Sequence, residues 1–131
     1  MDIRLTNRSS STCTLTGWVD FTMVGMNIIC TDGYVGQDCP PDYTAPRDQN
    51  ISRLELGVPK LYIVQPGEHV SFSALWNNGL GGPPKYCERL WLAPYAIELR
   101  VPGDQTAIPL RPAPVYPCRG EVAITVLGIN A

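Results

Sequence analysis

CTLTGWVDFTM, the stretch at residues 13–23, decides the fold class because apolar and polar side chains alternate along it. The odd-numbered side chains that form its apolar face are Cys13, Leu15, Val19, Phe21 and Met23. The even-numbered side chains of the opposite face are Thr14, Thr16, Trp18, Asp20 and Thr22. A period of two is typical of β-structure with one buried face. The stretch therefore predicts strands packed on a core.

Shorter runs with the same period lie on both sides of this stretch. At the start of the chain, Ile3 and Leu5 alternate with Arg4 and Thr6. The other runs predicted to be strands are 60–65, 68–76, 89–93, 96–101 and 121–127, and the side chains expected to point inward are Val70, Phe72, Ala74, Trp76, Leu90, Leu92, Ile97 and Leu99. Pro94 stands where the inward parity changes, as expected where a strand bends or changes sheets.

Glycine and proline interrupt the chain too often for long helices, with 12 Gly and 13 Pro spread over 131 residues. Only residues 48–56 could form a helical turn. About seven to nine short strands separated by turns predict an all-β fold, an antiparallel β-sandwich of the immunoglobulin-like kind. The length predicts one domain over residues 1–131. Within it, residues 31–50 form a long polar excursion rich in proline and glycine, and connections of that length are usually functional or mobile.

The charge balance argues against nucleic acid and anionic membranes as partners. Charged residues make up 17% of the chain, the formal net charge is -2 and the pI is about 5.2. Such a chain has no basic surplus with which to neutralise phosphates. No run reaches the roughly 18 apolar residues of a spanning helix, so no transmembrane segment is expected.

Five cysteines indicate an oxidising compartment, because that number is high for a cytosolic chain without metal-ligand spacing. No C-x-x-C motif occurs, so a zinc site is not expected. The opening residues 1–5 are not a signal peptide. The cysteine count therefore favours an exported chain whose leader has been replaced by Met1 over a chain that never carried a leader.

Three segments, taken in order, resemble a known family. They are LTNRSSSTCTLTGW at residues 5–18, VQPGEHVSFSALWNN at 64–78, and the two late cysteines, Cys87 in YCERLWLAP and Cys118 in YPCRGEVAIT. Together they resemble the bacterial secreted and lipoprotein-borne family called domain of unknown function 4232. The resemblance implies an immunoglobulin-like sandwich outside the cytosol, and it implies no activity, since the function of the family is undefined.

The resemblance also implies a disulfide between Cys87 and Cys118. The family commonly has a further cysteine upstream of the first strand, which this chain lacks, so Cys13 is expected to have no partner. A second bridge between Cys30 and Cys39 is expected within the long excursion, outside the pattern of the family. The sequence alone leaves the connectivity open.

Candidate residues for catalysis and metal binding are few. His69 is the only histidine, and its neighbour Glu68 would project to the opposite face of a strand, so the two cannot form a local dyad. Four aspartates in the long excursion could offer oxygen ligands to Ca²⁺, but their spacing matches no calcium motif: Asp32, Asp38, Asp42 and Asp48. We therefore expect no enzyme activity, no metal and no cofactor.

Tyrosines beside predicted turns are the most informative feature for function: Tyr34, Tyr43, Tyr86, Tyr95 and Tyr116. Tyrosine offers a large amphipathic surface at little entropic cost, which suits recognition of proteins or sugars. The leading hypothesis is a non-catalytic interaction module, secreted or on the bacterial cell surface, that binds protein or glycan through residues 31–50 and the loops of Tyr86 and Tyr95. The alternative is a structural subunit that contacts copies of itself or a neighbour, as in a virion decoration protein or an extracellular filament.

Overall fold

A computed structural model of the chain describes residues 1–25, 43, 49–76, 94–111, 113–115, 117 and 120–131. Within these residues the secondary structure is nine strands and no helix, which confirms the all-β prediction. The strands are β1 Asp2–Thr6, β2 Cys13–Leu15, β3 Asp20–Val24, β4 Asn50–Leu54, β5 Tyr62–Val64, β6 His69–Leu75, β7 Ala96–Arg100, β8 Ile108–Leu110 and β9 Glu121–Thr125.

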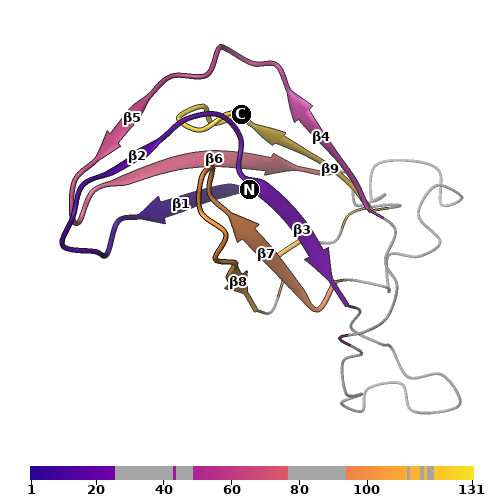
Figure 1. Ribbon diagram of the computed structural model, residues 1–131. Coiled ribbons are helices and arrows are strands. Elements are labelled where there is room, and N and C mark those ends of the chain that lie inside the picture. Colours follow the sequence, from indigo (N-terminus) through magenta and orange to yellow (C-terminus); the bar gives the residue numbers. More distant parts are fainter. Residues whose placement is uncertain (26–42, 44–48, 77–93, 112, 116, 118–119) are drawn as a thin grey trace, which may run out of the picture.

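The strands form three sheets (Figure 1). One sheet has four strands in the order β1-β6-β9-β4, a second pairs β2 with β5, and a third has the order β3-β7-β8. All pairs are antiparallel except β4 and β9, which run parallel with Ile51 opposite Val122. The prediction of a wholly antiparallel arrangement is therefore wrong at this pair, because the long connection between β4 and β9 lets the chain return in the same direction.

The stretch that could have formed a helical turn is also a strand over residues 50–54. Its backbone pairs along the whole length of β9, from Asn50 opposite Glu121 to Leu54 opposite Thr125. The hydrogen bonds that a helical turn would make internally are made here to a neighbouring strand instead. The pairing with β9 thus overrides the weak local preference of this segment.

The alternation in residues 13–23 is confirmed, but the run divides into two strands that belong to different sheets. Val19, Phe21 and Met23 are buried, while Cys13 and Leu15 are half-buried. The break falls at Gly17, whose φ of 93° is in the left-handed region that glycine adopts without strain. The Gly17 carbonyl accepts a 2.9 Å hydrogen bond from Leu127 N, which fixes the crossing between sheets against the C-terminal segment.

One hydrophobic cluster is shared by strands of all three sheets. Its buried members are Ile3, Val19, Phe21, Met23, Val64, Val70, Phe72, Ala74, Ile97, Leu99, Ala113, Val115, Val122, Ile124 and Leu127. Five of the side chains predicted to point inward are in this list, whereas Trp76 is half-buried and packs against the cluster. Leu90 and Leu92 lie outside the described residues.

Both chain termini lie on β6, where N and C are close together in Figure 1. The amine of Met1 donates a hydrogen bond to Ala74 O at 2.8 Å, and Ala131 N donates to Ser73 Oγ at 3.0 Å. Ser73 is fully buried although its parity is opposite to that of the core residues on β6. Its backbone N–H donates to the buried hydroxyl of Thr125 at 2.8 Å. The C-terminal segment therefore covers the outer face of this part of β6.

Candidate binding surface around Tyr43 and Tyr95

Two of the five predicted loop tyrosines, Tyr43 and Tyr95, are among the described residues, and they are in contact. The remaining predicted site residues lie outside the described residues, and they are Tyr34, Tyr86 and Tyr116, the cysteines Cys30, Cys39, Cys87 and Cys118, and the four aspartates of the excursion. Among the described residues, Cys13 is a half-buried free cysteine. The candidate site is therefore built from the tyrosine pair and its surroundings.

Tyr95 is held in place by the backbone just before β7. Its N–H donates to Val24 O at 3.1 Å, and its carbonyl accepts a hydrogen bond from Ala113 N at 3.1 Å. These two bonds tie the residue to the end of β3 on one side and to residues 113–115 on the other. The backbone of Tyr95 is therefore fixed, and its half-buried side chain can pack against another group.

Tyr43 contacts Tyr95 through its ring and its hydroxyl. The two ring centroids are 4.4 Å apart with an interplanar angle of 81°, an edge-to-face arrangement. The Tyr43 hydroxyl donates a hydrogen bond of 3.3 Å to the Tyr95 hydroxyl. Edge-to-face packing is one of the arrangements that aromatic pairs prefer. Tyr43 is still 55% exposed, so its ring remains available to a partner.

A cation completes the surface. The guanidinium carbon of Arg111, which directly follows β8, lies 5.8 Å from the centroid of the Tyr95 ring. This is within the range of a cation–π interaction. We call the group formed by the exposed Tyr43 and Arg111 and the half-buried Tyr95 the tyrosine–arginine surface. Arg111 was not predicted from the sequence, because nothing in its neighbourhood distinguishes it from any other loop arginine.

The hydrogen bond to Tyr95 raises the pKa of Tyr43 above its ordinary value of 10.0, while the nearby charge of Arg111 acts in the opposite direction. The bond holds the phenolic proton, so it favours the neutral form of Tyr43 in the folded protein. Its contribution to stability is complete below the ordinary pKa and is lost as the pH rises through the raised pKa.

Replacing Tyr95 with phenylalanine removes the acceptor, so we expect the pKa of Tyr43 to fall toward 10. Ultraviolet titration of tyrosinate in the alkaline range, with Tyr43→Phe used to identify the Tyr43 signal, measures this directly. Tyr62→Phe is the matched control, because Tyr62 lies on β5 and should leave the Tyr43 titration unchanged. An unchanged Tyr43 pKa in Y95F would contradict the hydrogen bond.

His69 lies exposed at the start of β6. The carboxylate of its neighbour Glu68 accepts a hydrogen bond from Gln65 N at 3.0 Å, so it closes the turn that precedes the strand. Within the described ranges, no group of three or more His, Cys, Asp or Glu side chains could hold a metal ion. Among the same residues, no helix is long and apolar enough to cross a membrane.

Exposed apolar side chains in the segment from the end of β4 to β5 are a second feature that sequence reasoning missed. Leu56, Val58, Leu61 and Ile63 are 47%, 70%, 66% and 61% exposed. Figure 1 shows this segment arching above β6 and β9. The available signal was the high apolar content of residues 56–63, LGVPKLYI, but alternation shows only which side chains share a face and not whether that face is covered.

The fold and the tyrosine–arginine surface define an all-β domain that carries an aromatic pair on its surface. The family model described as domain of unknown function (DUF4232) matches residues 1–128, so the chain belongs to that family. This confirms the resemblance found in the sequence. No curated protein and no solved structure matches the chain significantly.

Proposed function

We propose that this domain is a non-catalytic binding module, secreted or on the bacterial cell surface, that recognises a protein or glycan through the tyrosine–arginine surface. The observation that carries the proposal is the contact between Tyr43 and Tyr95, which come from distant parts of the chain and leave one ring 55% exposed. An aromatic ring that is held in place but not covered loses little entropy when a partner binds it.

The composition of the surface supports the same function. Tyrosine and arginine are among the residues that most often dominate the binding energy of protein interfaces. Tyrosine rings also stack on sugars through their apolar faces while the hydroxyl remains free to hydrogen-bond.

We further propose that the three sheets form an immunoglobulin-like sandwich stapled by Cys87–Cys118 and Cys30–Cys39. The support for a sandwich is the single hydrophobic cluster that strands of all three sheets share. The support for Cys87–Cys118 is the family resemblance of the segments that contain them, and the support for a second bridge is the count of five cysteines without a C-x-x-C motif. Two bridges would place the domain in an oxidising compartment.

Binding of the fluorescently labelled domain to intact cells of the bacterium that produces it tests the function. Flow cytometry should show saturable binding that weakens about tenfold or more in Tyr43→Ala and in Arg111→Ala. Val58→Ala is the matched control, because Val58 is exposed but lies outside the tyrosine–arginine surface. Loss of binding after protease treatment of the cells identifies a protein partner, and loss after periodate oxidation identifies a glycan. The proposal would be rejected if the domain did not bind the cells, or if Y43A and R111A bound them as strongly as the unmodified domain.

A second candidate function is a structural subunit of a larger assembly. The observation that favours it is the row of exposed apolar side chains at Leu56, Val58, Leu61 and Ile63, because surfaces of this kind usually mark contacts with another protein. Native mass spectrometry separates the two functions. A monomer is expected of the binding module, whereas a stable multimer would favour the assembly subunit.

A further inference from the structure

A cavity of about 510 Å³ lies apart from the tyrosine–arginine surface and shares no residue with it. Its walls come from β1, β2, β5 and β8 and from the loops that follow β1 and β7. The aliphatic side chains that line it are Leu5, Leu15, Val64, Val101 and Ile108. The volume is within the range of about 300–1,000 Å³ that small-molecule sites occupy.

Two uncharged polar residues of the lining, Asn7 and Ser9, already hydrogen-bond within the protein. The buried amide of Asn7 donates to Ser11 O at 2.7 Å and to Val64 O at 2.9 Å. Its oxygen accepts hydrogen bonds from Ser9 N at 3.0 Å and from Ser9 Oγ at 2.7 Å. These residues therefore shape the wall and contribute little to the recognition of a ligand.

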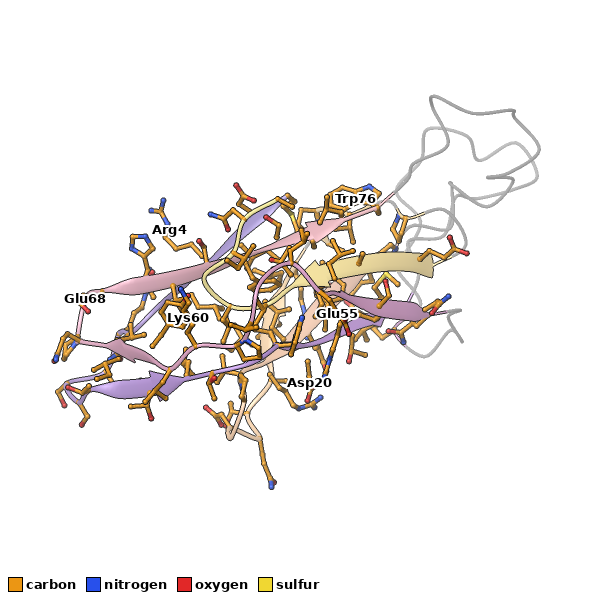
Figure 2. The ribbon with its side chains drawn as sticks, turned by 90° about the horizontal axis from the view of Figure 1, so that it is seen from above. Arg4, Asp20, Glu55, Lys60, Glu68 and Trp76 are labelled. Atoms are coloured by element: carbon orange, nitrogen blue, oxygen red, sulfur yellow. The ribbon has the colours of Figure 1, made fainter. Side chains whose placement is uncertain are left out.

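The charged residues that line the cavity are Arg4 and Arg8, and both are exposed. Figure 2 shows Arg4 extending away from the ribbon. Among the described residues neither arginine forms an ion pair, and the lining includes no carboxylate. Guanidinium groups bind carboxylates through paired charge-assisted hydrogen bonds. An apolar cavity whose lining residues include two arginines and no carboxylate matches a ligand with an apolar body and an anionic end.

We propose that the cavity binds a single-chain anionic amphiphile, a carboxylate of the fatty-acid type. The aliphatic tail lies against Leu5, Leu15 and Ile108, and the carboxylate pairs with Arg4 and Arg8. Burial of the tail supplies the affinity, because removing apolar surface from water is the main favourable term. The two arginines select an anionic head over a neutral one, since an unpaired carboxylate near an apolar wall is costly.

Isothermal titration calorimetry with dodecanoate, below the concentration at which it forms micelles, tests the proposal. We expect saturable binding with one ligand per chain. Dodecyl maltoside carries the same tail without the charge and should bind at least tenfold more weakly. Arg4→Ala with Arg8→Ala should weaken dodecanoate binding at least tenfold, whereas Arg53→Ala with Lys60→Ala removes two charges outside the cavity and should have no effect.

A second pair of variants tests the wall. Ile108 is 42% exposed and lines the cavity, so Ile108→Asp places a repelling charge there without disturbing the buried core and should abolish binding. Ile63→Asp is the control, because Ile63 is also exposed but lies outside the cavity. Y43A should bind dodecanoate normally, which separates this proposal from the proposed function. Absent dodecanoate binding, equal binding of dodecyl maltoside, or undiminished binding in R4A/R8A would overturn the proposal.

Discussion

Replacing Phe72 with alanine is expected to lower the free energy of unfolding by about 3–5 kcal/mol. Phe72 is fully buried on β6, and β6 lies between β1 and β9 in the four-stranded sheet. Its ring belongs to the cluster that strands of all three sheets share, so truncation leaves a cavity where the sheets meet. Much of the stability of a domain of this size would be lost, because the total is commonly 5–15 kcal/mol.

Urea unfolding followed by tryptophan fluorescence measures this loss. Val58→Ala is the matched control, because Val58 is 70% exposed and its truncation should change the free energy of unfolding by less than about 0.5 kcal/mol. A loss below about 1 kcal/mol in F72A would show that the core is not organised around β6.

Reduction of the protein is expected to lower its free energy of unfolding by about 3–4 kcal/mol, because we propose that Cys87 and Cys118 form a disulfide. The two cysteines are far apart in the sequence, so a bridge between them restricts the unfolded chain substantially. Urea unfolding with and without reductant measures the effect. Cys87→Ala should reproduce most of the loss, whereas Cys13→Ala should have little effect, because the Cys13 thiol is free.

Counting thiols in the unreduced, denatured protein provides the independent check. One reactive thiol is expected before reduction and five after it. Five reactive thiols before reduction would contradict both bridges. That result would also remove the main argument for an oxidising compartment, since the cysteine count is its basis.

The strands predicted best are those with one face on the core. Alternation predicted β1, β3, β6, β7 and β9, and the inward side chains on β6 and β7 are buried. The turn before β6 is equally local, because it contains Pro66 and Gly67 and glycine adopts the φ of 85° seen at Gly67 without strain. These features are local, so a short window of sequence contains the information that determines them.

The features that sequence reasoning missed depend on segments that are distant in the chain. Residues 50–54 became β4 because β9 offered a parallel partner, and residues 13–23 divided because β2 and β3 pair with different strands. Backbone hydrogen-bonding groups are the same in every strand, so alternation cannot show which strands pair or in which direction.

The candidate site shows the same division. The sequence identified Tyr43 and Tyr95 as separate loop aromatics, but their contact and the position of Arg111 required the fold. The cavity beside Arg4 and Arg8 was invisible because its lining comes from four strands and two loops. By itself, the sequence determined the all-β class and the family, because both depend on short patterns read along the chain. The tertiary structure alone decided the pairing of strands and the grouping of surface residues, because both depend on contacts between segments that no local pattern encodes.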